Sequence, residues 1–506
     1  MTHARTPVLV GVGQVVSHWD ASAGAQGAPS YLSLAIEAAQ RAIDDTGAKP
    51  GLAEAIDTAV MVRTMADSVP SFDQAFGQCN NLPRAVAEGI GAKPRTAIYS
   101  AVGGQSPQSL VNEMADRIYH GEDDVVLIAG SEALGAMKSA RRAGVELDWS
   151  HEVDGDFEDR GLGPMLLSRT EIKHGMVVPA YFYALFETAY AHKKEQSRST
   201  QIEAMSQLFA RFSDVAAHNP YAQFQTSRSA EFLSTPSKEN YPFADPYLKW
   251  HMAQDAVNMA AGVILMSSEK ADELGIDPAK RVYLHGAGEA HDDFISERPE
   301  LAGSWAMRTA LGRALEQSGK EARDMAMFDL YSCFPIAVFS STQAMGIDWK
   351  KEKRPLTLTG GLPFFGGPGN NYSLHGIASI VDVLRGQPGA YGLVLANGGW
   401  MTKEAAGVYS TEPCAAYKRA EPAATPDARV EIETEPTSGV LETFTVVNGR
   451  KGPGQAICFG RTEAGKRFVA MSQDEAVIAR LKADDFPIGA VIKVSSQAEV
   501  NTFEFA

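Results

Sequence analysis

One order of strands and helices occurs twice along this chain, and the duplication restricts the fold more than any other feature. An apolar pattern of helical spacing covers residues 35–47 and returns at 308–319, and both copies end on a glycine suited to a helix C-terminus. Ten residues after each glycine stands an aspartate that precedes an apolar run, at 58–62 and at 330–334, and each run predicts a short buried strand. The pattern therefore predicts two similar α/β halves.

Two further pairs of segments keep the same order in both copies. Residues 7–14 and 281–289 each predict a buried strand that ends in glycines. Residues 115–133 and 380–400 each predict a helix, a glycine turn and a strand that leads into a glycine-bearing loop. This agreement predicts that the two copies match along their whole length.

The segments outside the two copies differ from them in pattern. Between the copies, residues 141–280 are mainly helical in pattern, with a break at Asn219-Pro220, which predicts an inserted loop domain. A stretch rich in Pro, Ala and Glu near residues 415–430 predicts a linker, and the short apolar segments after it predict a small all-β, OB-like barrel. The predicted domains are an N-terminal half, an insert that returns to the core, a C-terminal half and an additional barrel, at 1–140, 141–280, 281–412 and 425–506.

Composition sets several function classes aside. The chain has 506 residues, 44% of them hydrophobic and 21% charged, and no apolar run is long enough to span a bilayer, so we expect no membrane association. The first residues show no signal-peptide pattern, which favours a cytoplasmic protein. A formal net charge of -16 argues against nucleic acid as a partner. The chain has four cysteines, Cys79, Cys333, Cys414 and Cys458. They form no CxxC pair, so neither a metal site nor a disulfide framework is expected.

Two similar halves with a loop domain inserted after the first resemble the thiolase superfamily, over roughly residues 5–410. The resemblance implies a five-layer αβαβα fold, an acyl-CoA thioester as substrate and no covalently bound cofactor. In thiolases four loops surround the reacting acyl group. They carry a nucleophilic cysteine that opens a helix, an Asn-Glu-Ala-Phe or His-Asp-Cys-Phe motif, a Gly-His-Pro motif and a Cys-x-Gly motif.

The residues at these four loop positions depart from the family's catalytic set. The nucleophilic cysteine falls at about Gly104, and "YSCF" at 331–334 stands at His-Asp-Cys-Phe. "GGP" at 366–368 puts Gly367 at the position of the base, and "ANGGW" at 396–400 lacks the last cysteine. These substitutions, and the extra C-terminal domain, look most like the bacterial thiolase-like proteins of type 1, which are similar to sterol-carrier-type thiolases. Without a thiolate and its base, the covalent Claisen step is lost.

A thioester can still be polarised by backbone N–H groups, and one acid or base then suffices for a retro-aldol or Claisen-type step. The resemblance places the oxyanion and substrate loops at Gly103, Gly104, Gly367, Asn371, Tyr372, Asn397, Gly398 and Gly399. The catalytic candidates are Tyr331 first, then Ser332, His375 and Cys333. For CoA itself, Asn258 and Met259 lie in the segment that resembles the family's binding segment.

Each candidate also has a structural interpretation. Tyr331 could be a packed tyrosine, Cys333 a small buried hydrophobic residue, and His375 a residue at a helix start. Asn371 and Tyr372 could stabilise a tight turn, and Lys403, just past the last loop, could be a solvated charge.

Two other functions stay open beside an aldol-type enzyme. One is a non-catalytic acyl-CoA-binding or scaffolding protein, and the other is an acetyl-CoA C-acyltransferase that uses Cys333. Certain thiolase-like steroid side-chain aldolases similarly lack the cysteines, place tyrosines in these loops and work with an OB-fold partner, which makes the barrel a candidate for a built-in partner. A homodimer through the strand before the nucleophile loop is usual in the superfamily, and the extra domain could block it.

Overall fold

The predicted duplication builds one continuous sheet. The computed structural model describes residues 3–414, 416–419, 421–426, 428–449 and 452–506. Its main sheet has ten strands in the order β10-β11-β12-β9-β1-β8-β4-β2-β3-β5. The two halves meet where Val8 pairs with Tyr283 and Leu9 with Val282, so β1 and β9 join the copies edge to edge.

The first half has the predicted order of elements. Its helix α1 begins at the cap Ser30 and ends at Gly47, whose φ of 61° is the left-handed conformation that glycine adopts readily. The strand β8 returns from the insert and pairs with both β1 and β4. The elements are β1 (Pro7–Val16), α1 (Tyr31–Thr46), β2 (Thr58–Met61), α2 (Leu82–Gly89), β3 (Thr96–Tyr99), α3 (Ser106–His120), β4 (Val125–Glu132) and β8 (Met259–Ser267).

The second half repeats this order with one correction. The strand predicted over 330–334 ends at Leu330, and Tyr331–Phe334 form a loop, because Pro335 starts the next helix and the chain must turn before it. The elements are β9 (Val282–His291), α10 (Trp305–Ser318), β10 (Met327–Leu330), α11 (Pro335–Ala344), α12 (Tyr372–Arg385), β11 (Tyr391–Gly398) and β12 (Lys403–Ser410).

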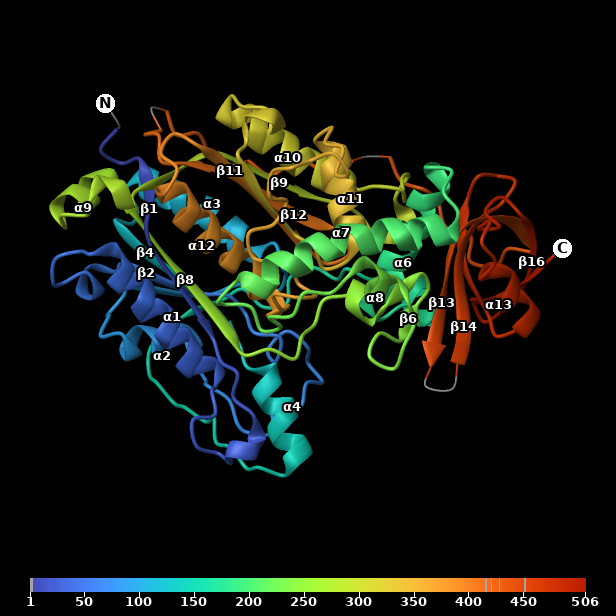
Figure 1. The fold of residues 1–506 in the computed structure, drawn as a ribbon, viewed down its shortest axis with the longest axis horizontal. Coiled ribbons are helices and arrows are strands. Elements are labelled where there is room, and N and C mark those ends of the chain that lie inside the picture. The colour runs from blue at the N-terminus through green and yellow to red at the C-terminus, as the bar shows by residue number, and fades with distance from the viewer. Residues whose placement is uncertain (1–2, 415, 420, 427, 450–451) are drawn as a thin grey trace.

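The helices cover the sheet in layers. Helices α3 and α12 pack against each other and against strands of both halves, so they lie between the two parts of the sheet (Figure 1). Helices α1 and α2 cover the outer side of the first half, and α10 covers that of the second. The predicted five-layer αβαβα arrangement is confirmed.

The segment between the halves is mainly helical up to α7, which ends at His218 with Asn219 as its cap. The prediction of a mainly helical pattern over 141–280 is wrong after this point, because short strands, short helices and the long strand β8 follow. Its long helices α6 and α7 cross the molecule toward the C-terminal barrel (Figure 1). The elements are α4 (Leu134–Ala143), β5 (Glu158–Asp159), α5 (Arg169–Lys173), α6 (Pro179–Lys193), α7 (Arg198–His218), α8 (Ala230–Ser234), β6 (Pro242–Ala244), β7 (Tyr247–Leu248) and α9 (Ser268–Glu273). No helix among the described residues has the length and apolarity needed to cross a bilayer.

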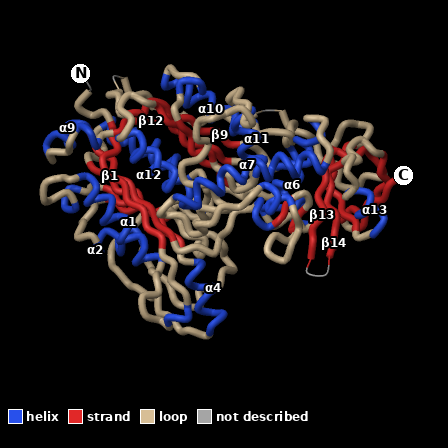
Figure 2. Tube along the Cα trace, in the orientation of Figure 1, coloured by secondary structure: helices blue, strands red, loops and turns tan. Residues whose placement is uncertain are grey.

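The C-terminal residues form the predicted OB-like barrel, visible as a separate group of strands at one end of the molecule (Figure 2). Its strands follow each other as β13-β14-β15-β17-β16, and β13 pairs with both β14 and β16 to close the barrel. The pair β15–β17 is parallel, as the OB topology requires. The elements are β13 (Ser438–Gly449), β14 (Gly452–Arg461), β15 (Arg467–Ser472), α13 (Glu475–Leu481), β16 (Val491–Gln497) and β17 (Val500–Phe505).

The barrel is attached to the core by its second and third strands. Ile457, Phe459 and Val469 are buried in the same hydrophobic cluster as residues of α6 and of the second half, while Cys458 and Ala470 fill the barrel interior. OB folds commonly bind ligands on the face of these two strands. In this chain that face is occupied by the protein's own core.

Candidate functional site

The structure brings together the loops that the sequence singles out. The hydroxyl of Ser373 donates to the carbonyl of Gly104 at 3.0 Å, and the N–H of Gly103 donates to Asn370 Oδ1 at 3.1 Å. A Cβ atom at Gly104 would lie 2.5 Å from both Tyr331 Oη and the carbonyl oxygen of Asn397. The loops around residues 104, 331, 370 and 397 therefore meet at one point.

A group of polar side chains fills this meeting point. Asn397 Nδ2 donates to Tyr183 Oη at 3.0 Å and lies 3.8 Å from Cys333 Sγ. Tyr183 comes from α6 of the insert and also donates to the carbonyl of Gly399 at 3.1 Å. Glu404 is the cross-strand partner of Asn397, so the two side chains extend from the same face of the sheet. We call Tyr183, Tyr331, Cys333, Asn397 and Glu404 the polar centre.

Glu404 is a functional candidate that the sequence analysis missed. Its side chain is fully buried, and neither carboxyl oxygen has a hydrogen-bond partner among the described residues. Burial raises the pKa of Glu404 well above its usual value, and the nearby Asp292 adds to this while Arg298 opposes it. The signal was present in the sequence, because Lys403 and Glu404 are charged residues at the start of an otherwise apolar strand.

The acidic groups beside Glu404 also keep their protons. Burial raises the pKa of Tyr331 well above its usual value, and the neighbouring acids Cys333 and Glu404 add to the effect whenever they ionise. Burial raises the pKa of Cys333 to about 12, so its thiol is neutral at physiological pH and is a weak nucleophile. The acidic side chains of the polar centre are therefore buried and protonated.

On the same loops lie other buried polar atoms that have no hydrogen-bond partner within the described parts of the chain. They include Ser332 Oγ, Asn371 Oδ1 and Asn397 Oδ1. An unsatisfied buried polar group is costly, and several of them in one place indicate a site built for a ligand or a reaction. Asn371 Nδ2 does have a structural role, because it donates to the carbonyl of Gly130 at 2.7 Å, and Tyr372 Oη bonds Thr359 Oγ1 at 2.6 Å.

Two sequence candidates have mainly internal contacts. His375 is fully buried in the first turn of α12, with Nδ1 2.9 Å from Gln14 Oε1 on β1, and burial lowers its pKa to about 3. Asn258 accepts from the N–H of Ala136 at 2.6 Å and donates to the carbonyl of Ser17 at 3.2 Å, and Met259 beside it is fully buried. Roles for these residues in catalysis or CoA binding stay predictions.

Lys403 is not the solvated charge that the sequence suggests. Its side chain is buried and its ammonium donates to the carbonyl of Val102, directly before Gly103. Burial lowers the pKa of Lys403 to about 8. The loop that carries Gly103 and Gly104 therefore has a buried cation next to it.

The glycines between 360 and 369 allow close approach of the insert and of β4. A Cβ at Gly360 would lie 2.5 Å from Ala216 of α7, and one at Gly366 would lie 2.8 Å from Met259 Sδ. The N–H of Gly367 donates to the carbonyl of Gln254 at 2.8 Å. These contacts give the glycines a packing role, and a ligand-facing role for Gly367 stays a prediction.

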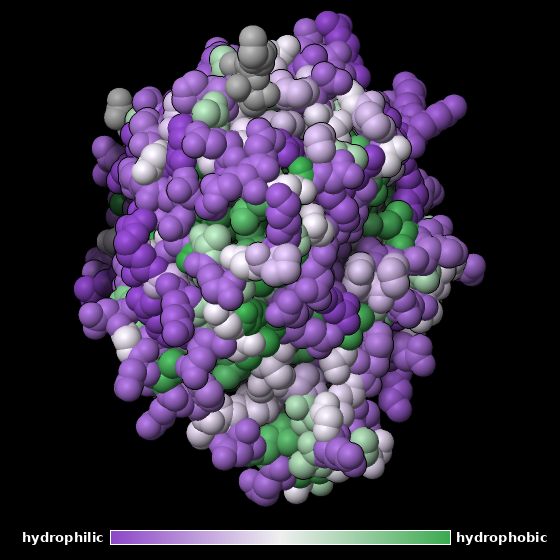
Figure 3. Space-filling model, turned by 90° about the vertical axis from the view of Figure 1, so that its left-hand side faces the viewer, coloured by the Kyte–Doolittle hydropathy of each residue, from purple (hydrophilic) through white to green (hydrophobic). Residues whose placement is uncertain are grey.

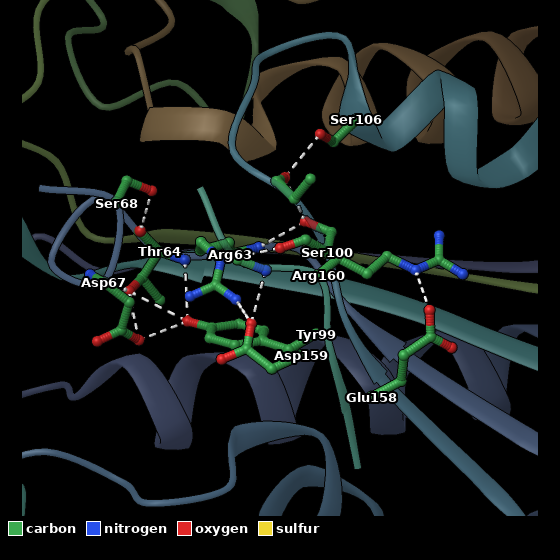
Figure 4. A network of polar contacts seen from close by, with 12 residues as sticks. Arg63, Thr64, Asp67, Ser68, Tyr99, Ser100, Ser106, Glu158, Asp159 and Arg160 are labelled. Carbon is green, nitrogen blue, oxygen red and sulfur yellow. Dashed lines mark hydrogen bonds and ion pairs between the residues drawn. The ribbon is translucent and has the colours of Figure 1, made fainter. Parts of the chain in front are cut away.

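A polar network at the edge of the sheet supports the Gly103–Gly104 loop (Figure 4). Arg63 pairs with Asp159 of β5, its guanidinium lies 4.3 Å over the ring of Tyr99, and its Nε donates to the carbonyl of Ser100 at 2.9 Å. The carbonyl of Arg63 accepts from Asn370 at 2.8 Å. The network thus joins the edge strand to two of the converging loops.

A cleft of about 830 Å³ in the insert gathers cations around an aromatic ring. The guanidinium carbon of Arg228 lies 3.6 Å from the centroid of the Trp250 ring, and Lys249 Nζ lies 4.7 Å from it. Lys238 also lines the cleft. Trp250 in turn stacks on Phe364, with ring centroids 6.2 Å apart. Phe364 belongs to residues 360–369, which we call the glycine-rich segment. The sequence analysis missed this cleft, because its cations are spaced far apart along the chain.

A known structure is similar to this chain over its full length. The chain is 36% identical to a monomeric SCP2-thiolase like protein type 1 (STLP1) from Mycobacterium smegmatis, with a TM-score of 0.83 and 100% of both chains covered. A family model for the thiolase-like protein type 1 additional C-terminal domain matches residues 419–499.

More distant relatives share the fold. The Ltp2-ChsH2(DUF35) aldolase is 19% identical, with a TM-score of 0.58 over 81% of this chain and 99% of that chain. Acetyl-CoA acetyltransferase 1 of Arabidopsis thaliana is 23% identical over 141 residues, which span 28% of this chain and 31% of the plant enzyme.

Proposed function

Because the chain belongs to the thiolase-like proteins of type 1, we propose that it binds an acyl-CoA thioester and cleaves or forms a carbon–carbon bond of the acyl group without a covalent intermediate. The observation that supports this most is the polar centre, where Glu404 has no hydrogen-bond partner in the part of the chain that the structure describes and Tyr331 touches the loop of Gly104. The Ltp2-ChsH2(DUF35) aldolase has a related fold, and as part of the proposal we extend its reaction class to this chain.

The reaction we propose is an aldol-type step. In the cleaving direction the β-hydroxyl of the acyl group loses its proton, the Cα–Cβ bond breaks, and its electron pair passes to the thioester carbonyl as an enolate. The N–H of Gly104 is our candidate for the enolate oxygen, since that of Gly103 already bonds Asn370. Glu404, whose raised pKa keeps it protonated, would deliver that proton to Cα from one carboxyl oxygen while its other oxygen takes up the hydroxyl proton, so that the group ends as it began. Tyr331 would relay the hydroxyl proton by giving its own to Glu404 as it accepts that of the substrate.

The cleft of Arg228 and Trp250 is our candidate for the nucleotide end of CoA. Guanidinium and ammonium groups bind phosphates, and the partly exposed Phe232 ring in the cleft offers apolar surface to a base, while Trp250 lies buried beneath Arg228. The contact between Trp250 and Phe364 connects this cleft to the glycine-rich segment. The proposal therefore puts the nucleotide in the insert and the acyl group at the polar centre.

Arg228→Ala is expected to weaken CoA binding about tenfold or more, because a charge-assisted contact to phosphate is lost. Calorimetry with CoA and with 3′-dephospho-CoA checks this. The wild type should prefer CoA, and the variant should lose most of that preference. The control is Arg323→Ala, an exposed cation of the second half paired with Glu321. If Arg228→Ala keeps the full preference for CoA, the cleft does not bind the 3′-phosphate.

A non-catalytic binding function is the second candidate, and one observation favours it. Tyr331 is only 6% exposed and Cys333 only 7%, so the polar centre is closed by its own side chains. Mass spectrometry of acyl-CoAs that co-purify with the protein identifies the ligand, and a turnover assay with that ligand separates the two functions. Binding without turnover would favour the non-catalytic protein.

We also propose that the chain is a monomer. The strand β3, which precedes the Gly103–Gly104 loop, does not form the free edge of the sheet, because β5 pairs with it at Ile98 and Tyr99. The face of the molecule shown in Figure 3 is mostly hydrophilic, with hydrophobic residues in small groups. Sedimentation velocity is expected to give a species near 54.3 kDa at all loading concentrations. A concentration-dependent dimer would contradict this.

A further inference from the structure

An arginine of the C-terminal barrel reaches out of the barrel into the core. Arg467, at the start of β15, is fully buried, and its Nη1 donates to the carbonyls of Ser296 and Arg298 at 2.9 and 2.6 Å. Its Nε and Nη2 donate to the carboxylate of Glu442 on β13, both at 2.7 Å. One guanidinium thus connects two strands of the barrel to the turn at 296–298.

The same turn carries a second buried arginine, which points toward the polar centre. Arg298 donates through Nη1 to the carbonyls of Trp400 and Met401 at 3.0 and 3.2 Å. Its Nη2 donates to Thr402 Oγ1 at 2.7 Å. These residues form the loop between β11 and β12, and Asn397 and Glu404 lie at its two ends.

The backbone of this loop needs such contacts. Met401 has a φ of 50°, a left-handed conformation that is uncommon for a residue with a side chain. Such conformations persist where the surrounding structure fixes them, and they occur often at functional sites. Arg298 bonds the carbonyl of Met401 itself and that of the residue before it.

We infer that Arg467 and Arg298 are positioning residues through which the C-terminal barrel fixes the loop 398–402 and so sets the geometry of the polar centre. The barrel then acts as a permanent support for one wall of the site. The inference rests on the proposed function only in its consequence for turnover, and the contacts themselves can be tested without it.

The test compares two arginines that pair with the same carboxylate. Arg461 donates to Glu442 through Nε and Nη2, both at 3.0 Å, and its Nη1 donates to the carbonyl of Gly465, which lies within the barrel. Amide hydrogen exchange is measured for Arg467→Met and Arg461→Met at residues 398–404, with β1 as the internal reference. Arg467→Met should accelerate exchange at 398–404 at least tenfold and leave β1 unchanged, whereas Arg461→Met should leave both unchanged.

Two further variants keep the test decisive. If Arg467→Met does not fold, Arg467→Lys replaces it in the test. Lysine keeps the charge beside Glu442 but cannot bond that carboxylate and both carbonyls together. A smaller acceleration of amide exchange at 398–404 is therefore expected. Arg298→Lys should act on the same amides with the barrel unchanged. Equal exchange at 398–404 in the Arg467 and Arg461 variants, or a change confined to the barrel, would overturn the inference. Because exchange is measured without substrate, a protein that lacks turnover still gives a clear result.

Where turnover exists, it provides a second readout. A positioning role predicts that Arg467→Met lowers kcat while the affinity for CoA, measured by calorimetry, stays the same, because the Arg228 cleft is separate from the loop. A loss of CoA affinity equal to the loss of kcat would indicate general destabilisation instead, and would count against the inference.

Discussion

Glu404→Gln should lower turnover of the co-purifying acyl-CoA about a hundredfold or more, the range that loss of a general acid or base usually costs. Glutamine keeps the size of the side chain and its place in β12 but cannot transfer a proton. Since neither carboxyl oxygen of Glu404 has a partner among the residues that the structure describes, the substitution breaks no hydrogen bond between that side chain and those residues. The expected result is therefore a fall in kcat with CoA affinity unchanged.

The measurement is product release followed by liquid chromatography and mass spectrometry, with calorimetry for binding. Tyr331→Phe should cause a loss of the same order, because it removes the hydroxyl that faces Gly104. Glu37→Gln on the exposed surface of α1 is the matched control and should behave as the wild type. Wild-type kcat in Glu404→Gln would remove this carboxyl from the reaction, whereas a wild type without turnover would favour the binding function.

Most of the fold could be predicted from the sequence, because it depends on repeated local patterns. The two copies of the strand and helix order gave the layers, and the short apolar segments after residue 430 gave the barrel. What could not be predicted depends on few residues or on distant contacts. The edge strand β5 has only Glu158 and Asp159, both exposed, so no hydrophobic pattern marks it.

The candidate site was predictable only where it coincides with the family's loops. Glycines at loop positions looked ligand-facing, yet at Gly360 and Gly366 the close neighbours are Ala216 and Met259, which are remote in sequence. The cations around Trp250 come together only because the insert folds back on itself. Glu404 is marked in the sequence only by its place beside Lys403 at the start of an apolar strand, and charged residues in such a place are normally exposed.

A second carboxyl, Glu132, makes the stability of the protein depend on pH. It is fully buried at the end of β4, where Oε1 accepts from the N–H of Met65 at 2.6 Å and Oε2 has no partner among the described residues. Burial raises its pKa to about 8, with the charges of Asp67 and Asp255 adding to the effect. In the unfolded chain the same group ionises near its ordinary value of 4.5.

Between these two pKa values the folded state keeps a proton that the unfolded state releases, so the free energy of unfolding falls as pH rises from about 4.5 to about 8. This difference between the folded and unfolded pKa values corresponds to a loss of roughly 3 to 5 kcal/mol in the free energy of unfolding across the window. Glu132→Gln removes the titration but keeps the acceptor for Met65. The variant should therefore gain several kcal/mol relative to the wild type on going from pH 5 to pH 8.

Urea unfolding of the wild type and of Glu132→Gln at pH 5 and pH 8 measures this difference. Subtracting one free energy of unfolding from the other at each pH cancels the contribution of every other group that titrates in the window. Any cost of placing an amide N–H₂ where Oε2 had no partner is the same at both pH values, so it does not enter the pH-dependent part. Glu88→Gln, an exposed carboxyl on α2, is the control and should show no such gain. An equal stability difference between wild type and Glu132→Gln at the two pH values would mean that Glu132 ionises in the folded protein at its ordinary pKa, and hence that water or a cation reaches its carboxylate.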